Sequence, residues 1–192
     1  MLVALVAALT VGTGVLLWME TAPARPTVPL PLQVVQSAQD NGMLAVVRTA
    51  QVPLQYIKWS GGSVVVHDLG RDSPAIAGGC HFLIGSAAQF GDGEVRATSR
   101  WLQQRDGNHV EVPGFSFNTN SVGICLLTDF GRSGPTARQW KGLVGLIRAI
   151  QITCEIPSDR VYLHSDLGRA GCPGGEFPAG VELRKQLIPA AR

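Results

Sequence analysis

Charged residues are scarce in this chain of 192 residues, which contains 16% Asp, Glu, Lys and Arg and has a formal net charge of +2. This near-neutral balance excludes a disordered acidic tail and disfavours nucleic-acid binding, because nucleic-acid-binding domains carry clustered basic residues. Aromatic residues are also few, at 6%, which disfavours a base-stacking platform for single strands. No internal repeat is visible, and the length favours one domain with a substantial core over two domains.

The first 24 residues contain no Lys or Arg and only one acid, Glu20. Residues 2–19 form an apolar run whose length is at the lower limit for a bilayer span and exceeds the apolar region of a secretory signal. Ala22-Pro23-Ala24 offers a small-residue cleavage site, although no basic residue precedes the apolar run. We therefore expect residues 1–20 to form an apolar helix that is a signal peptide or a membrane anchor; a buried core helix is the third alternative. A signal peptide or an anchor would place the rest of the chain outside the cytoplasm.

Residues 21–40 form a spacer in this interpretation, and residues 41–192 form the folded domain. The spacer is rich in proline over its first half, and proline-rich chains are extended and semi-rigid. Its prolines are Pro23, Pro26, Pro29 and Pro31. An exported domain carried by such a spacer would contact the membrane through residues 1–20, provided that these are not cleaved.

Several short strands are predicted in the folded part. Residues 64–66 form a β-branched run that ends at His67, and residues 161–163 form a similar run that ends at His164. Both runs have the length and composition of strands. Residues 122–127 are continuously apolar, as in a strand that is covered on both faces.

A hairpin and a long helix complete the predicted architecture. Residues 82–84 and 94–95 are separated by a glycine-rich connection, which predicts a hairpin. Thr136 and Gln139 form a capping box, and residues 40–48 predict a further strand or short helix. The helix that follows the capping box has an apolar stripe of Trp140, Leu143, Val144, Ile147 and Ile150. The pattern predicts an α/β fold with a mixed central β-sheet flanked by helices, preceded by the apolar N-terminal helix.

Two of the predicted strands end in a histidine, and ligand sites of open α/β sheets lie outside strand ends. Cys172 follows His164 by eight residues, in a loop rich in Gly and Pro. Two neutral imidazoles and a thiolate, here from His67, His164 and Cys172, can bind zinc and leave a fourth position for water, as in catalytic zinc sites. Zinc lowers the pKa of bound water toward neutrality and can polarise a carbonyl. The spacing therefore admits a catalytic zinc site.

Each of these residues also has a structural interpretation. A histidine at a strand end is often a hydrogen-bonded structural residue, and a cysteine of an exported protein is often half of a disulfide. Four cysteines, at positions 80, 125, 154 and 172, allow three complete pairings. Cys125 in a strand and Cys154 at a helix end also fit buried small apolar residues. Composition and spacing alone leave both the metal site and the disulfides open.

A series of short motifs runs through residues 58–177. The motifs are Val64-Val65-Val66-His67, Gly79-Cys80-His81-Phe82-Leu83-Ile84-Gly85, Gly91-Asp92-Gly93-Glu94-Val95, Arg100-Trp101 with Gly107-Asn108-His109, Asn120-Ser121-Val122-Gly123-Ile124-Cys125-Leu126, Pro135-Thr136 with Gln139, and residues 161–173. In this order they resemble the zinc-dependent N-acetylmuramoyl-L-alanine amidase and peptidoglycan recognition protein superfamily. Any one motif is ordinary, but the unbroken series is specific.

The resemblance implies a mixed sheet flanked by helices, with zinc in a groove. It also implies hydrolysis of the amide that joins N-acetylmuramic acid to L-alanine of the stem peptide. Transferred position by position, the zinc ligands are His67, His164 and Cys172. His109 matches a histidine that lines the groove, where it would act in catalysis and orient the substrate. The implied partners are peptidoglycan or muropeptides, and the implied location is the cell envelope, in the periplasm or on the membrane facing the wall.

Two positions depart from the family pattern. Cys80 stands where active members have Tyr, and Ala170 stands where they have Lys or Thr; those groups help to activate water or stabilise the oxyanion. Their replacement affects turnover and leaves metal binding intact. Arg169 can supply positive charge to the substrate, although an arginine cannot act as a base. Glu94 is a candidate substitute base and otherwise a solvated hairpin residue.

The leading hypothesis is therefore an exported zinc amidase that acts on peptidoglycan. One alternative is a recognition module that retains the groove and the zinc but does not cut. Another is a structural domain stapled by disulfides, without a metal. Loss of a metal ligand would be the simplest route to a pure binding module, and no ligand of the family pattern is lost, which favours the enzyme.

Overall fold

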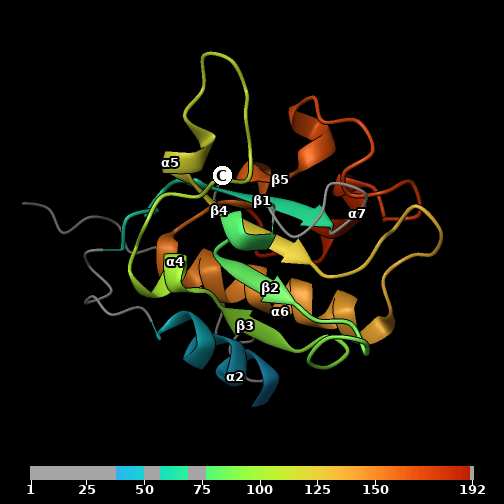
Figure 1. The fold of residues 1–192 in the computed structure, drawn as a ribbon. Coiled ribbons are helices and arrows are strands. Elements are labelled where there is room, and N and C mark those ends of the chain that lie inside the picture. Colours follow the sequence, from blue (N-terminus) through green and yellow to red (C-terminus); the bar gives the residue numbers. More distant parts are fainter. Residues whose placement is uncertain (1–37, 50–56, 69–76, 191–192) are drawn as a thin grey trace, which may run out of the picture. The chain divides into compact units, whose positions relative to one another are not determined.

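A computed structural model gives the fold of residues 38–49, 57–68 and 77–190 (Figure 1). The apolar helix predicted over residues 1–20 lies outside these described residues, and so does most of the proline-rich spacer. Within the described residues, no helix combines the length and the apolar character that a membrane span requires.

A five-stranded sheet forms the centre of the fold. Its strands are β1 (Ser63–Asp68), β2 (Phe82–Ile84), β3 (Val95–Ala97), β4 (Ser121–Leu126) and β5 (Val161–Leu163). They lie in the order β3-β2-β4-β1-β5, all neighbours being parallel except β2 and β3, which form an antiparallel hairpin. The predicted mixed sheet is confirmed, and β1 continues one residue past His67.

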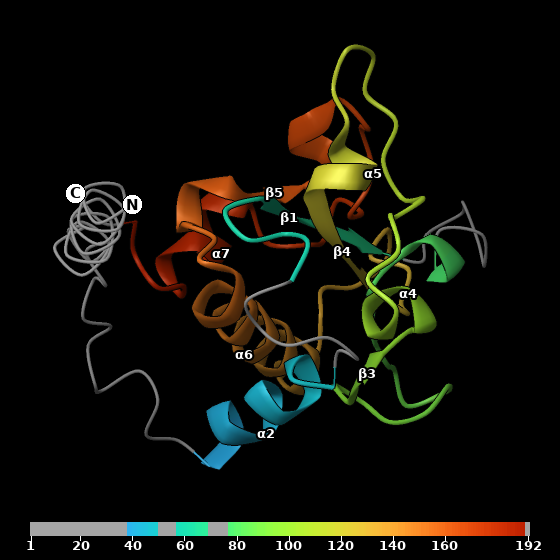
Figure 2. The same ribbon diagram turned by 90° about the vertical axis from the view of Figure 1, so that its left-hand side faces the viewer.

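Two helices pack on one side of the sheet. The longer is α6 (Ala137–Cys154), and α2 (Ala38–Val47) packs against it. Figure 2 shows both helices below the sheet, and α5 (Phe117–Asn120) above it. The segment for which the sequence predicted a strand or a short helix is therefore a helix. The other helical segments are α4 (Ser99–Leu102), η3 (Ser158–Arg160), η4 (His164–Leu167) and α7 (Gly180–Lys185).

The predicted capping box begins α6 and also attaches the helix to the sheet. Thr136 Oγ1 accepts the Gln139 backbone N–H at 3.0 Å, and the Thr136 N–H donates to Gln139 Oε1 at 3.2 Å. The Gln139 amide nitrogen then donates to the Gly85 carbonyl and to Thr128 Oγ1. The helix ends at Cys154, because the next residue adopts a left-handed backbone conformation.

Side chains of the strands alternate between the two faces of the sheet. On β4, the apolar side chains belong to the core beneath the sheet, together with the apolar stripe of α6. Gly123 and Cys125 therefore face the opposite side. Every residue of β4 is buried, which confirms the strand predicted to be covered on both faces. The core residues of β1, β4 and α6 are Val64, Val66, Val122, Ile124, Leu126, Leu143, Val144, Leu146, Ile147, Ala149, Ile150 and Cys154.

The capping box gives a prediction about stability. Thr136→Ala removes the acceptor of the Gln139 N–H and a hydrogen bond from the threonine hydroxyl to Asp92. We expect the free energy of unfolding, measured by urea denaturation, to fall by about 1 kcal/mol. Thr119→Ala is the matched control, because the exposed Thr119 hydroxyl bonds only to the exposed Asp106 carboxylate. Equal losses in the two variants would contradict a specific role of the cap.

Candidate metal centre

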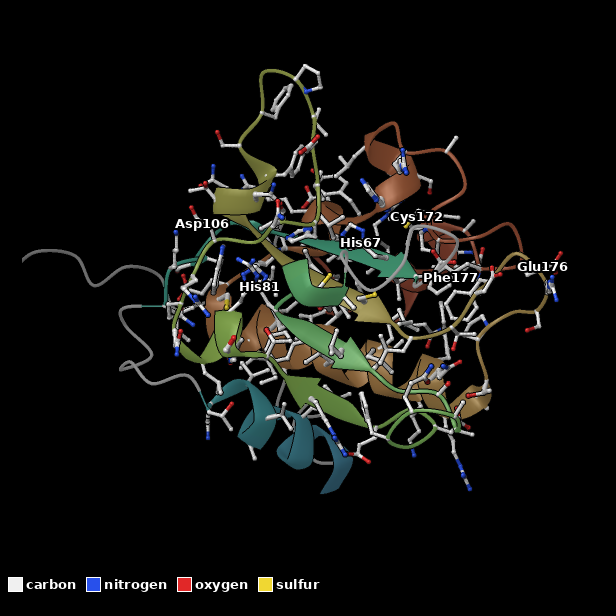
Figure 3. All side chains as sticks on the ribbon, in the orientation of Figure 1. His67, His81, Asp106, Cys172, Glu176 and Phe177 are labelled. Carbon is white, nitrogen blue, oxygen red and sulfur yellow. The ribbon has the colours of Figure 1, made fainter. Side chains whose placement is uncertain are left out.

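Parallel pairing of β1 with β5 places two histidines side by side. Val66 pairs with Leu163 in this register, so the residues that follow, His67 and His164, emerge at the same end of the sheet. Cys172 reaches them from the loop after η4, and Figure 3 shows it beside His67. The potential ligand atoms of the three residues lie within 4.8 Å of one another, and all three residues are buried. The structure therefore brings together the three ligands that the sequence predicts.

The spacing and chemistry of these atoms fit zinc. His67 Nδ1 lies 3.0 Å from His164 Nδ1 and 3.9 Å from Cys172 Sγ. Zinc bonds of about 2.0 Å to nitrogen and 2.3 Å to sulfur in a tetrahedron place ligand atoms roughly 3.3–3.6 Å apart. Two imidazoles and one cysteine also leave the fourth position of a tetrahedron open, as in catalytic zinc sites. The cluster is consistent with the zinc site implied by the resemblance.

His67 also contacts the buried His109, and the direction of this hydrogen bond decides which His67 nitrogen can bind a metal. His67 Nε2 lies 3.0 Å from His109 Nδ1. Donation of the Nε2 hydrogen to His109 leaves the Nδ1 lone pair of His67 free to face His164 and Cys172. Burial, and then the neighbouring His109 and His164, lowers the pKa of His67 well below its usual 6.5. His67 is therefore neutral at pH 7, which is the form that binds a metal.

Cys172 lies in an irregular loop that is attached to the end of β1. Burial raises the pKa of its thiol to about 12, and a bound cation would favour the thiolate. The attachment is made by Asp68, which directly follows His67 and is 2% exposed. Asp68 Oδ2 accepts the N–H of Gly174 at 2.9 Å and that of Phe130 at 3.2 Å. Asp68 was not predicted from the sequence, because a single acid after a strand forms no recognisable motif.

His109 occupies a slot between two glycines on the upper face of the sheet. A Cβ atom at Gly107 would lie 2.4 Å from Cδ2 of the His109 ring, and one at Gly123 would lie 2.5 Å from it. Both positions therefore require glycine. The side-chain oxygen of Asn118 accepts the backbone N–H groups of His109 and Val110. Burial, followed by the neighbouring histidines, lowers the pKa of His109 to about 3, so this ring is also neutral at pH 7.

A hollow of about 640 Å³ lies beside His109 and His164, a volume in the usual range for ligand sites. Residues 110–113, in the loop before α5, form part of its wall, and Arg169 contributes from the loop after η4. The sequence predicted Arg169 as a substrate-binding residue, and its exposed side chain is at the hollow. Glu111 also lines the hollow; no sequence signal pointed to it, because it belongs to no motif.

Three other positions singled out in the sequence lie outside the three-ligand cluster. Glu94 is exposed in the connection between β2 and β3, where its Oε1 forms an ion pair with Arg96 Nε at 2.9 Å. Cys80 is fully buried beside Cys125, and burial raises the pKa of its thiol well above the usual range. Ala170 is exposed and carries no ionisable group. All four cysteines are free, which gives no support to the disulfide-stapled alternative.

His81 is a structural histidine. Its Nδ1 accepts the Gly123 N–H at 2.9 Å, and its Nε2 donates to the Arg105 carbonyl at 3.0 Å. Its ring also contacts the edge of Trp59, with 4.3 Å between centroids. Both ring nitrogens are therefore occupied, and Figure 3 shows His81 away from Cys172. The sequence placed His81 in a motif of the family but assigned it no role.

Comparison with protein families identifies one match. Residues 52–175 match the family model described as N-acetylmuramoyl-L-alanine amidase. No curated protein matches the chain. The matched segment contains His67, His109, His164 and Cys172, so the family match and the buried cluster concern the same part of the chain.

Solved structures with low sequence identity share the fold. The amidase LysC from Clostridium intestinale URNW has a TM-score of 0.52 and 21% identity, over 71% of this chain and 91% of that chain. A selenomethionine derivative of AmpD has a TM-score of 0.50 and 19% identity, over 67% and 85%. A mutant of Drosophila PGRP-LB, in complex with tracheal cytotoxin, has a TM-score of 0.48 and 19% identity, over 74% and 92%. At these identities the first two similarities show the fold alone.

The buried His81 gives a prediction about pH. Burial lowers its pKa to about 4 from the usual 6.5, so between these values the unfolded chain binds a proton that the folded protein excludes. The stability contributed by the neutral ring is therefore complete above pH 6.5 and is lost as the pH falls toward 4. In the metal-free chain, His81→Gln should lower stability at pH 7. It should also reduce the slope of unfolding free energy against pH by up to about 1.4 kcal/mol per unit. Urea denaturation between pH 4.5 and 7 measures both effects, and an unchanged slope would contradict the prediction.

Proposed function

Since this chain belongs to the N-acetylmuramoyl-L-alanine amidase family, we propose that it hydrolyses the amide between N-acetylmuramic acid and L-alanine in peptidoglycan, with zinc as cofactor. The observation that carries the proposal is the buried cluster of His67, His164 and Cys172, whose ligand atoms lie within 4.8 Å of one another. Because His164 also lines the hollow, an amide bound there would lie next to the metal position.

The residues of the chain have distinct roles in this proposal. His67, His164 and Cys172 hold the metal, and the neutral state of His67 keeps its Nδ1 lone pair available. When bound, zinc supplies Lewis acidity at the scissile carbonyl and lowers the pKa of water. His109 accepts the Nε2 hydrogen of His67 and so fixes the direction of its lone pair. These roles need no ionised histidine at neutral pH.

Substrate positioning is assigned to the hollow. His109 lines its floor, and Arg169 presents a positive charge at its wall. The stem peptide of peptidoglycan carries carboxylates, which a guanidinium binds through paired hydrogen bonds. The proposed substrates are therefore peptidoglycan or muropeptides, with Arg169 as a contact for the peptide part.

An exported location belongs to the same proposal. Residues 1–20 would act as a signal peptide or a membrane anchor, and the proline-rich segment that follows would separate the domain from the membrane. The apolar run of residues 2–19 supports this location, which would place the domain in the periplasm or on the membrane, facing the wall.

Cys80 and Ala170 favour a second candidate function, the recognition of peptidoglycan fragments without hydrolysis. The Cys80 thiol is buried and protonated at neutral pH, so it cannot act as a base. Ala170 offers no polar group beyond its backbone. Such a module would keep the hollow and the metal but would not release cleavage products.

Removal of one ligand tests the enzyme hypothesis. Cys172→Ala leaves two imidazoles, so we expect loss of stoichiometric zinc and a fall of at least about 100-fold in amidase activity. Zinc content is measured by elemental analysis, and activity by release of soluble fragments from peptidoglycan with and without a chelator. Cys154→Ala is the matched control, because it removes a buried thiol that lies on α6.

Three outcomes separate the hypotheses. Retention of stoichiometric zinc by the Cys172→Ala variant would refute the ligand assignment. A parent chain that binds zinc and muropeptides without releasing fragments would support the recognition module. Activity that is insensitive to the chelator would refute the role of zinc.

A glycine substitution tests the placement of His109. In Gly123→Ala, the new Cβ would lie within 2.7 Å of three His109 ring atoms, so the ring must leave its slot. We expect kcat at saturating zinc to fall by about tenfold or more. Zinc affinity should also fall, because His67 loses its outer-shell partner although the three ligands are unchanged. Gly42→Ala is the control, since a Cβ there meets nothing within 4 Å. Wild-type kcat in the Gly123→Ala variant would contradict the role given to His109.

A further inference from the structure

The position of Cys172 requires an anchor. This ligand is 105 residues away from His67 in the sequence, and it lies in a turn-rich segment that contains no helix or strand. Segments of this kind open locally at low free-energy cost unless they are held by contacts with the core. A loosely held thiol would seldom meet two imidazoles that the ends of β1 and β5 hold fixed.

Asp68 provides such a contact. Its side chain is 2% exposed, and its Oδ2 accepts the Gly174 N–H at 2.9 Å, two residues beyond Cys172. The same oxygen accepts the Phe130 N–H, in the segment after β4, at 3.2 Å. One carboxylate oxygen therefore joins the end of β1 to two other segments. Hydrogen bonds to an ionised acceptor are about twice as strong as those between neutral groups.

Phe130 completes the attachment from the other side. Its carbonyl accepts the Glu176 N–H at 2.9 Å, and its ring lies 5.2 Å from that of Phe177. A Cβ at Gly174 would lie 2.3 Å from the carbonyl carbon of Phe130, so the two backbones are in direct contact there. Residues 174–177 are thus held by Asp68 and Phe130, and the Asp68 side chain binds both this segment and the Phe130 backbone.

We propose that Asp68 is the positioning residue of the metal centre: its carboxylate holds the Cys172 loop on the end of β1 so that the thiol meets His67 and His164. The inference rests on the proposed zinc site, but it concerns a residue outside the ligand set. Because Asp68 follows His67 directly, the strand end that supplies one ligand also fixes the segment that supplies another.

Zinc affinity of the full chain tests the proposal. Asp68→Ala should weaken zinc binding by about 10- to 100-fold, the usual effect of losing an outer-shell partner, in competition with a chromophoric chelator. Asp68→Asn should restore most of the affinity, because an amide oxygen can accept both N–H groups. Asp129→Ala is the matched control, because it removes an exposed carboxylate of the same segment that accepts the N–H of Gly131, two residues away.

A second measurement needs no metal. In the metal-free chain, Cys172 is labelled with a thiol reagent and identified by peptide mapping. The rate is measured across pH, because burial and also the Asp68 side chain raise the pKa of this thiol; the part of the rate change that remains after correction for the thiolate fraction reports opening of the loop. We expect the corrected labelling rate of Cys172 to be at least about tenfold higher in Asp68→Ala than in the parent. In Asp68→Asn and Asp129→Ala it should equal that of the parent. The other three cysteines are fully buried, so faster labelling of all four would report global unfolding.

The outcomes distinguish this inference from the proposed function. Asp68→Ala with parental zinc affinity and parental Cys172 labelling would overturn the positioning role. Equal defects in Asp68→Asn and Asp68→Ala would overturn the role of the hydrogen-bond acceptor in favour of charge. A parent chain that binds zinc but does not hydrolyse peptidoglycan would refute the proposed amidase activity, and the test of Asp68 would remain valid. A parent that binds no zinc would refute the proposed function, and the labelling rates would still decide whether Asp68 holds the loop.

Discussion

The parallel pairing of β1 with β5 is the constraint on which the site depends. Parallel strands end at the same edge of a sheet. Because Val66 pairs with Leu163, the residue that follows each of them lies beside the residue that follows the other. Both of these residues are histidines, so the hydrogen-bond ladder of the sheet determines the distance between two ligands. A shift of the register by one residue would turn one imidazole to the opposite face of the sheet and remove it from the cluster.

Close backbone packing around the imidazoles follows from that constraint. The His67 ring lies against the rings of His109 and His164, and a buried ring nitrogen is costly when it has no partner. His67 finds one partner in His109, and His109 fits only because Gly107 and Gly123 carry no side chain. His81 binds the backbone of Gly123 from the other side. Gly123 thus leaves room for the His109 ring and donates its N–H to His81. This links the metal position to the stability of the sheet.

Local patterns account for the parts of the molecule that the sequence predicted. Strand ends, the Thr136 capping box and the identity of three ligands all depend on residues close together in the chain or on an ordered series of motifs. Asp68 was missed because its two hydrogen-bond partners lie more than 60 residues away, and such pairing leaves no local pattern. His81 could not be recognised as structural for the same reason, since its partners come from two separate segments.

The buried polar groups bear on the choice between hydrolysis and recognition. A module that only binds wall fragments needs the walls of the hollow, which residues 110–113 and Arg169 supply. A binding module that had lost the metal would gain nothing from three donor atoms set at metal-binding distances, and burying such groups lowers stability unless each is paired. In this chain Asp68 Oδ2 accepts two backbone N–H groups, and the ligand atoms of the three residues lie within 4.8 Å of one another. Because the arrangement is costly except in a metal centre, it argues for a metal site, which hydrolysis requires, and against a binding module without metal. Cys80 and Ala170 bear on the rate of hydrolysis and leave the ligand set unchanged.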